Sequence, residues 1–357
     1  MVTTILFFIV GLVLLIAGAE LLVRGASTLA ARIGMTPLVI GLTVVAFGTS
    51  APELAISMQS GLAGEDALLL GNIIGSNIFN VLFILGVSAL ITPLVVSKNL
   101  IKLDVPLMVG ISFVLYFFAW DGLVSRLEGG ILFGALVLYV GYLIYDAQKS
   151  NHSSSIEDES SQNERYSTRH WFWDGVLIVV GLALLVIGAQ WLVDGAVTFA
   201  EYIGVSSLVV GLTIVAAGTS LPEVATSILA SVKGQRDLAV GNIVGSNLFN
   251  IMCIIGLTAT VLPNGITVQQ GVIGFDLPIM IAAAIMCLPI FFTGNVISRW
   301  EGILFLGYYI AFTLYLILTA TEHHLTPLFN AAMGWFVLPM TIITGIIILI
   351  KELRNRT

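Results

Sequence analysis

Charged residues are scarce in this chain: they make up 10% of its 357 residues, whereas apolar residues make up 58%. A soluble domain carries roughly 25% charged residues, so this chain cannot cover a surface that faces water. Cysteine is limited to Cys253 and Cys287, both in apolar segments, so neither a disulfide framework nor a thiolate metal site is indicated. The four histidines lack the spacing of a zinc site. The composition predicts an all-α polytopic membrane protein that is surrounded by the lipid bilayer.

Motifs of catalysis are also missing. No phosphate-binding loop occurs, and the segments GTSAPE and GTSLPE do not match the G-x-S-x-G pattern of a hydrolase nucleophile. We therefore expect neither an enzyme nor a primary pump. We also expect no cofactor, no nucleic-acid partner and no obligatory protein partner.

Long apolar runs are what the chain does have. About 20 apolar residues span a bilayer as a helix, and eleven such runs are present: 5–23, 37–60, 67–92, 104–120, 128–146, 171–193, 207–232, 237–262, 272–293, 301–321 and 328–350. Of the 14 Lys and Arg residues, 13 fall in odd-numbered loops or the C-terminal tail, and only Arg126 falls in an even-numbered loop. Because basic loops stay cytoplasmic, we expect a multi-pass protein of the plasma (inner) membrane with its N-terminus outside and its C-terminus cytoplasmic.

The chain contains an internal repeat. Residues 41–60 read GLTVVAFGTSAPELAISMQS and residues 211–230 read GLTIVAAGTSLPEVATSILA, identical at 12 of 20 positions. Residues 71–80 (GNIIGSNIFN) and 241–250 (GNIVGSNLFN) are identical at 8 of 10 positions, with the same offset of 170. Weaker echoes are LDVPLM with FDLPIM and SRLEG with SRWEG. Such a repeat indicates a duplicated architecture.

The repeat suggests how the chain is divided. We expect a first transmembrane repeat over residues 1–146, a cytoplasmic linker over 147–170, a second transmembrane repeat over 171–321, and an extra C-terminal helix with a basic tail over 322–357. Each repeat holds five spans, and because five is odd the second repeat enters the membrane from the opposite side. Inverted repeats bring equivalent residues together near the middle of the membrane. The alternative is a duplication that only records ancestry, but the most similar stretches are polar ones.

The repeated Gly-Thr-Ser-x-Pro-Glu segment places a carboxylate in the middle of an apolar run, at Glu53 and at Glu223. A charge at this depth is costly and is by default functional. Pro52 and Pro222 lack an N–H and displace the carbonyl four residues earlier, which predicts a break in each helix. Carboxylates, hydroxyls and freed carbonyls are oxygen ligands, which suit a hard cation such as Ca2+ better than zinc or copper.

The second repeated segment carries a polar stripe, because side chains four residues apart share one helix face. The stripe consists of Asn72, Ser76 and Asn80 in the first half and Asn242, Ser246 and Asn250 in the second. We favour an ion-binding role for Ser76, Asn80, Ser246 and Asn250. For Asn72, Asn77, Asn242 and Asn247 two roles stay open, ion binding and hydrogen bonding between helices.

These segments resemble the two α-repeats of the cation/Ca2+ exchanger superfamily, specifically the prokaryotic Na+/Ca2+ exchangers. The resemblance covers roughly residues 1–321. It implies that Glu53 and Glu223 are the central ion ligands, and that further oxygens come from Thr49, Ser50, Ser76, Asn80, Thr219, Ser220, Ser246 and the carbonyls of Ala46 and Ala216. It also implies transport by alternating access, in which the first and sixth spans slide across the rest. Some relatives carry Asp at the position of Asn250, which accompanies K+ co-transport, so the Asn here argues against dependence on K+.

A secondary antiporter that exchanges Na+ for Ca2+ is the favoured function, because two glutamates neutralise one Ca2+ or, with hydroxyl and amide oxygens, host two or more Na+. A Ca2+/H+ antiporter and a passive cation channel remain alternatives. Outside the repeated motifs, Glu20 is read as an interfacial carboxylate, or as part of an access path. Asp104 and Asp276 are read as helix caps or interfacial anchors.

Overall fold

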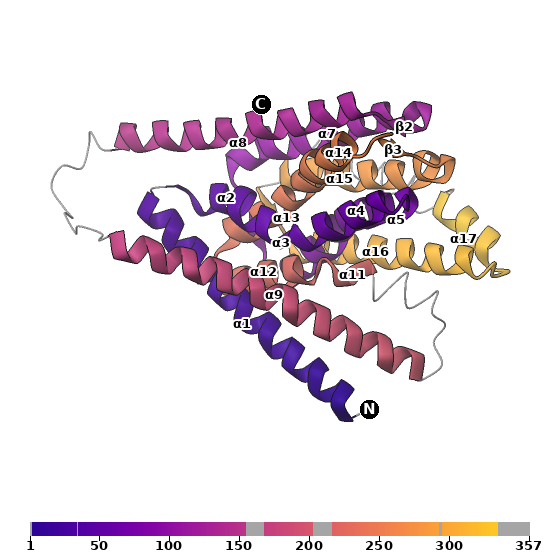
Figure 1. Cartoon of the computed structure of the whole chain (residues 1–357), viewed down its shortest axis with the longest axis horizontal. Coiled ribbons are helices and arrows are strands. Elements are labelled where there is room, and N and C mark those ends of the chain that lie inside the picture. The colour runs from indigo at the N-terminus through magenta and orange to yellow at the C-terminus, as the bar shows by residue number, and fades with distance from the viewer. Residues whose placement is uncertain (1, 34, 155–167, 203–215, 293–294, 335–357) are drawn as a thin grey trace.

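The computed structural model describes residues 2–33, 35–154, 168–202, 216–292 and 295–334, and Figure 1 shows that these are mainly helical. In the labels, η marks a π-helical turn, except that η4 is a 3-10 turn. The elements of the first half are α1 (Val2–Ile33), α2 (Pro37–Ile40), η1 (Gly41–Val45), α3 (Ala46–Thr49), α4 (Ala51–Leu62), α5 (Asp66–Phe79), η2 (Asn80–Ile84), α6 (Leu85–Ile91), β1 (Leu94–Val95), η3 (Leu100–Asp104), α7 (Val105–Phe118), η4 (Ala119–Asp121), β2 (Leu123–Val124) and α8 (Arg126–Ser154). Those of the second half are α9 (Thr168–Tyr202), α11 (Ala216–Gly218), α12 (Leu221–Val232), α13 (Arg236–Phe249), η6 (Asn250–Ile255), α14 (Gly256–Val261), β3 (Ile266–Thr267), η7 (Val272–Asp276), α15 (Leu277–Phe292), β4 (Val296–Ile297), α16 (Arg299–Ala320) and α17 (Thr326–Ala332).

Seven helices among the described residues are long and apolar enough to cross a membrane, and the bent pair Pro37–Thr49 with Ala51–Leu62 makes an eighth. Two more of the predicted spans contain shorter apolar helices, Leu221–Val232 and Val272–Leu288. The last predicted span, 328–350, lies largely outside the described residues. A polytopic helical architecture with seven or eight spans is therefore confirmed, and the count of eleven stays a prediction.

The boundaries of the predicted linker stay a prediction, but helices occupy both of its ends. Helix α8 continues to Ser154 and α9 begins at Thr168, so helical structure enters the polar segment 147–170 from both sides. Residues 155–167 lie outside the described part of the chain.

The two halves contact each other through pairs of elements, and in each pair one element comes from each half. The strand β1 pairs with β4 and β2 pairs with β3, each antiparallel, so each ribbon joins one strand from each half. Helix α6 packs on α16 where Gly86 meets Gly302, and α14 packs on α8 where Gly256 meets Gly129. A Cβ added at any of these glycines would approach a backbone atom of its partner helix, within 3.1 Å at most, so the close packing needs glycine.

The weak SRLEG and SRWEG echo marks the start of two equivalent helices. Ser125 N donates to Glu128 Oε2 at 2.8 Å before α8, and Ser298 N donates to Glu301 Oε2 at 2.7 Å before α16. Both are capping boxes, which satisfy the free N–H groups at a helix start.

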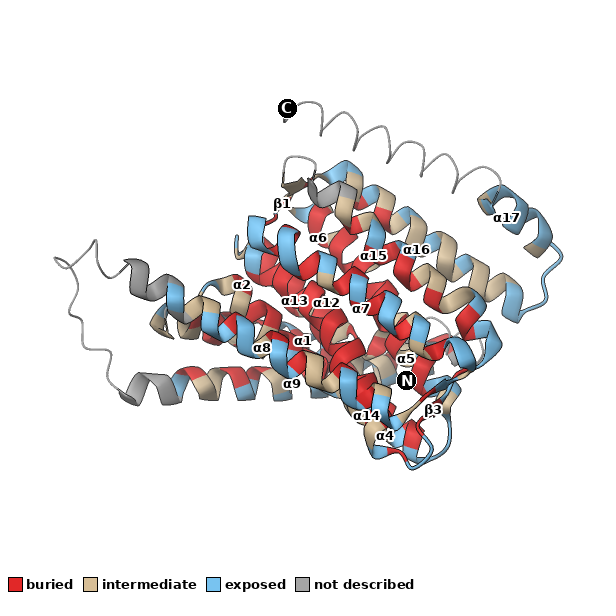
Figure 2. Cartoon of the chain, turned by 90° about the horizontal axis from the view of Figure 1, so that it is seen from above, coloured by how far each residue is buried: buried red, intermediate tan, exposed pale blue. Residues whose placement is uncertain are grey.

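Two helices form the centre of the molecule. In the span Arg236–Val261, which contains α13, every residue of the apolar 18-residue stretch is buried. In the span Asp66–Ile91, which contains α5, 78% of the corresponding stretch is buried. Figure 2 shows this buried centre with α8, α9 and α16 towards the outside. The long helices α1 and α9 pack on each other and share a separate apolar cluster with parts of α12 and the Pro37–Val45 segment.

Candidate functional site

Both proline-containing helices are broken where the sequence predicts. Helix α3 ends at Thr49, Ser50 has φ −81° and ψ 5°, and α4 starts at Ala51 with a 45° bend. In the second half, Ser220 has φ −88° and ψ 6° between α11 and α12. A proline in the first turn of α4 and of α12 explains the break, because it cannot donate the hydrogen bond that would continue the preceding helix.

The breaks bring the two repeated glutamates into one buried region. Glu53 and Glu223 are each 1% exposed. Ser50 Oγ donates to Glu223 Oε1 at 3.1 Å, and Ser220 Oγ donates to Glu53 Oε1 at 3.1 Å. Each serine thus reaches the glutamate of the other repeat, so the site is assembled across both halves.

Threonines and asparagines form a second reciprocal set around these carboxylates. Thr49 Oγ1 donates to Asn242 Oδ1 at 3.1 Å, and Thr219 Oγ1 donates to Asn72 Oδ1 at 3.3 Å. The amide nitrogens of the same asparagines are also used: Asn72 Nδ2 donates to Ser57 Oγ and Asn242 Nδ2 donates to Ser227 Oγ, both at 3.0 Å. Because their oxygens and nitrogens all have partners, Asn72 and Asn242 join the helices.

The remaining asparagines form a buried network between α5 and α13. Asn80 Nδ2 donates to Asn247 Oδ1 at 3.2 Å, and Asn250 Nδ2 donates to Asn77 Oδ1 at 3.0 Å. Asn77 and Asn247 in turn direct their amide nitrogens at Met280 and Met108, at 3.5 and 3.4 Å from the sulfur atoms. The side-chain nitrogens of Asn77 and Asn247 therefore have partners within the protein, whereas the side-chain oxygens of Asn80 and Asn250 have none among the described residues.

Five buried oxygens of the predicted set have no hydrogen-bond partner among the described residues: Glu53 Oε2, Glu223 Oε2, Ser76 Oγ, Asn80 Oδ1 and Asn250 Oδ1. A buried polar group without a partner costs free energy, so each such group calls for an explanation. The carboxylate, amide and hydroxyl oxygens together are the donor set that hard cations take. No group of three or more His, Cys, Asp or Glu that could hold a metal is found in the described part of the chain.

The other predicted site residues lie in the same region. Ser246 Oγ lies 3.5 Å from Glu223 Oε1. The carbonyl of Ala46 accepts the N–H of Ser50 at 3.0 Å and the hydroxyl of Thr49 at 3.4 Å. Ala216 is the first residue of α11, and residues 211–215 before it lie outside the described part of the chain.

Four residues that support the site were not predicted from the sequence. Ser57 and Ser227 hold Asn72 and Asn242, and Met108 and Met280 accept from the central amides. These four residues could have been found from the sequence, because the two serines and the two methionines occupy equivalent positions in the repeated segments. The π-helical turns that begin at Asn80 and Asn250 were not predicted either; such turns are frequent at functional sites.

The prediction that Asp104 is a helix cap or an interfacial anchor needs correction. Asp104 is 2% exposed and makes no cap; its Oδ1 accepts the hydroxyl of Tyr139 in α8 at 2.8 Å. It is buried because η3 carries it into the interior against α8. Glu20 makes ion pairs with Arg24 and Lys233, which were not predicted; its role as an interfacial carboxylate or as part of an access path stays a prediction.

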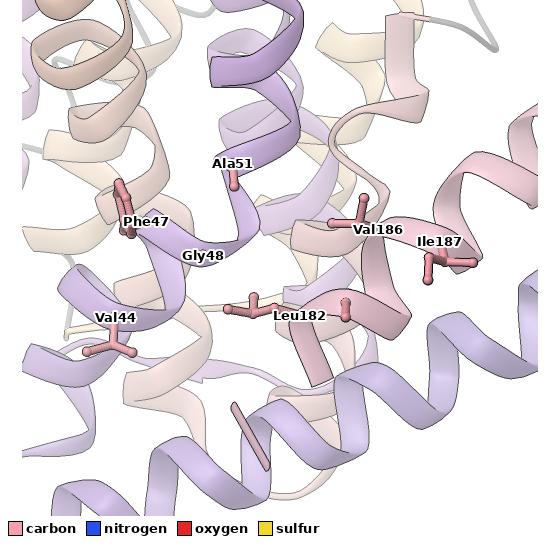
Figure 3. A pocket seen from close by; sticks show the side chains of 8 residues that line it. Val44, Phe47, Gly48, Ala51, Leu182, Val186 and Ile187 are labelled. Carbon is pink, nitrogen blue, oxygen red and sulfur yellow. The ribbon is translucent and has the colours of Figure 1, made fainter. Parts of the chain in front are cut away.

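An apolar groove of about 570 Å3 lies beside the break in the first half. It is lined by Val44, Phe47, Gly48, Ala51, Leu182, Ala183, Val186 and Ile187, and Figure 3 shows that these come from the broken segment and from α9. Ala51 directly follows Ser50, so the groove runs next to the buried carboxylate region.

Comparison with known proteins places this architecture in a family. The sequence pattern of the family described as sodium/calcium exchanger protein matches residues 3–145 and 173–318. Sodium/calcium exchanger MaX1 of Methanosarcina acetivorans is 33% identical over 305 residues, which are 76% of this chain and 86% of MaX1. Inner membrane protein YrbG of Escherichia coli is 36% identical over 231 residues, which are 62% of this chain and 69% of YrbG.

Solved structures agree with the sequence comparison. The sodium-calcium exchanger NCX_Mj, soaked with 10 mM Na+ and zero Ca2+, matches the fold with a TM-score of 0.74 and 29% identity, over 87% of this chain and 97% of NCX_Mj. Because the family pattern covers both halves and the fold agrees, this chain belongs to the sodium/calcium exchanger protein family and is a membrane transporter, not an enzyme.

Proposed function

We propose that the chain is a secondary active antiporter that exchanges Na+ for Ca2+ across the membrane by alternating access. The observation that carries the proposal is the group of five unpartnered oxygens, drawn from both halves and buried around Glu53 and Glu223. Two buried carboxylates need compensating positive charge, and one Ca2+ or two or more Na+ supply it. The same oxygens serve either ion, so binding of one excludes the other and couples their fluxes.

The proposed ion site is made of oxygen atoms alone. Glu53 and Glu223 are its central ligands, and its other members are Thr49, Ser50, Ser76, Asn80, Thr219, Ser220, Ser246, Asn250 and the carbonyls of Ala46 and Ala216. Ca2+ takes 6–8 oxygens, which this set can provide. The reciprocal contacts of Ser50 and Ser220 support the assignment, because they bring ligands of both repeats to the same point.

The proposed architecture is a pair of inverted five-span repeats, 1–146 and 171–321, joined by the cytoplasmic segment 147–170 and followed by an extra helix in 322–357. The exchanged strand and helix pairs between the halves support it. The charge bias of the loops supports an N-terminus outside and a cytoplasmic C-terminus. The similarity to YrbG, described as an inner membrane protein, supports location in the inner membrane.

Calcium uptake into proteoliposomes tests the function. The purified chain is reconstituted into vesicles loaded with Na+, with K+, or with an acidic buffer alone, and Ca2+ entry is followed. Na+/Ca2+ exchange predicts uptake that requires internal Na+ and stops when the Na+ gradient is dissipated. Uptake driven by the pH gradient alone would instead identify a Ca2+/H+ antiporter, and uptake without any counter-gradient would identify a channel.

A further inference from the structure

The helices α1 and α9 form one closely packed antiparallel pair. Glycines recur every seven residues along both contact faces, at Gly11, Gly18 and Gly25 in α1 and at Gly181, Gly188 and Gly195 in α9. A Cβ at Gly18 would lie 2.7 Å from Gly181 O, and one at Gly188 would lie 2.6 Å from Leu15 N. Glycines on both faces let helices in a membrane approach each other closely. Displacement of one helix therefore carries the other with it.

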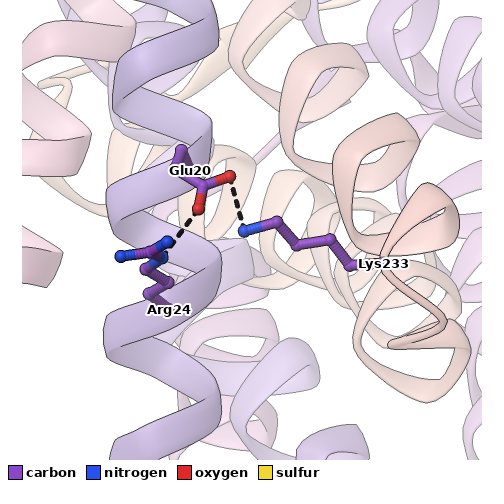
Figure 4. Close-up of polar contacts among 3 residues, drawn as sticks. All are labelled: Glu20, Arg24 and Lys233. Carbon is purple, nitrogen blue, oxygen red and sulfur yellow. Dashed lines mark ion pairs between the residues drawn. The ribbon is translucent and has the colours of Figure 1, made fainter.

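The two helices of the pair make different contacts with the rest of the protein. Helix α1 packs along α12, and at the end of α12 Lys233 Nζ lies 2.5 Å from Glu20 Oε2 of α1 (Figure 4). Arg24 pairs with the same carboxylate at 2.7 Å, but from within α1. The pair of Glu20 and Lys233 is thus an ionic contact between the α1–α9 pair and the central helices.

The equivalent helices of the other half do not pack in the same way. Across the repeat, α9 and α4 correspond to α1 and α12, but in the described structure α9 does not pack along α4. It meets the broken segment at Gly48, where a Cβ would lie 2.6 Å from Leu182 Cδ1, and the apolar groove lies beside this contact (Figure 3). The positions equivalent to Glu20 and Lys233 are Gln190 and Ala63, both exposed. Closing this side would bring together an amide and a methyl group, which cannot form an ion pair.

We propose that Glu20 and Lys233 form an ionic latch that biases the transporter toward the arrangement with α1 docked on α12 and the groove open. The proposal rests on the proposed alternating access, in which the α1–α9 pair shifts so that α9 docks and α1 leaves. That shift breaks the Glu20–Lys233 ion pair, and Gln190 and Ala63 cannot form a replacement ion pair on the other side. In the proposed orientation Lys233 is cytoplasmic, so the latch keeps the cytoplasmic side closed.

Disulfide cross-linking across the groove tests the latch. Phe47→Cys and Val186→Cys are placed on opposite walls of the groove, in a background with Cys253→Ala and Cys287→Ala. A disulfide forms only when the two Cβ atoms come within about 4.5 Å, so its rate reports the population with a closed groove. The measurement is made in membranes without Na+ or Ca2+.

We expect Glu20→Gln and Lys233→Ala each to raise the cross-linking rate about two- to five-fold, the range for partly exposed ion pairs. Arg24→Ala is the matched control and does not raise the rate, because Arg24 pairs with Glu20 from within α1 and its removal leaves the contact between Glu20 and Lys233 in place. Moving the pair to the other side with Ala63→Lys and Gln190→Glu also raises the rate. An unchanged rate in both latch variants, or an equal rise in Arg24→Ala, would overturn the latch. Transport assayed on the same samples separates the two proposals, since the cross-link needs no transported ion.

Discussion

The reciprocal serines allow a sharp prediction about the site. Ser50 and Ser220 are 3% and 0% exposed, and each donates one 3.1 Å hydrogen bond to the glutamate of the opposite repeat. A hydrogen bond to a charged group contributes about 1.5–3 kcal/mol. Ser50→Ala and Ser220→Ala are therefore each expected to weaken Ca2+ binding by about 10- to 150-fold, and by similar amounts because their contacts are equivalent.

Isothermal titration of Ca2+ into the detergent-purified protein measures this effect. Ser112→Ala is the matched control, because Ser112 is 2% exposed but donates to the carbonyl of Met108 in its own helix. Its affinity for Ca2+ is expected to stay that of the wild type. If only one of the two serines changed the affinity, or if both matched the control, the site would not be built equally from the two repeats.

Two further predictions concern stability, measured by thermal unfolding in detergent. Gly188→Ala should destabilise the protein by about 1–3 kcal/mol, because its Cβ would meet Leu15 N and Gly11 O. Gly175→Ala on the same helix is the control, because its Cβ would meet no described atom within 4 Å. Equal unfolding temperatures of the two variants would argue against close α1–α9 packing. Tyr139→Phe should cost about 1–3 kcal/mol because it leaves the buried carboxylate of Asp104 without its hydroxyl donor. The exposed Tyr142 provides the control substitution Tyr142→Phe, and a loss as large as that of Tyr139→Phe would refute the role of the Asp104 contact.

The repeated motif was enough to predict the helix breaks and the meeting of the two glutamates. The break before Pro52 and the shared location of Glu53 and Glu223 followed from the repeated motif. Within the polar stripe, the sequence favoured ion binding for Asn80 but left two roles open for Asn72, and contacts between segments far apart in the chain now distinguish the two residues. The hydroxyl of Thr219 donates to the side-chain oxygen of Asn72. The side-chain oxygen of Asn80 has no partner in the described structure.

The carboxylates Asp104 and Glu20 show the same limit. Asp104 precedes a proline at the start of a helix, a pattern typical of a cap, but its partner Tyr139 is 35 residues away on another helix. Glu20 pairs with Arg24 one helical turn away, but also with Lys233 in the other half of the chain. Long-range pairing of this kind cannot be deduced from spacing.

The central claim is that Glu53 and Glu223 are two halves of one cation site. The most direct measurement is Na+-dependent Ca2+ uptake into proteoliposomes by Glu53→Gln and by Glu223→Gln, with Glu65→Gln in the exposed turn before α5 as the control. The account predicts that each site substitution alone abolishes exchange while the protein still folds and inserts, and that the control transports at the wild-type rate. Normal Ca2+ exchange by either site variant would contradict it.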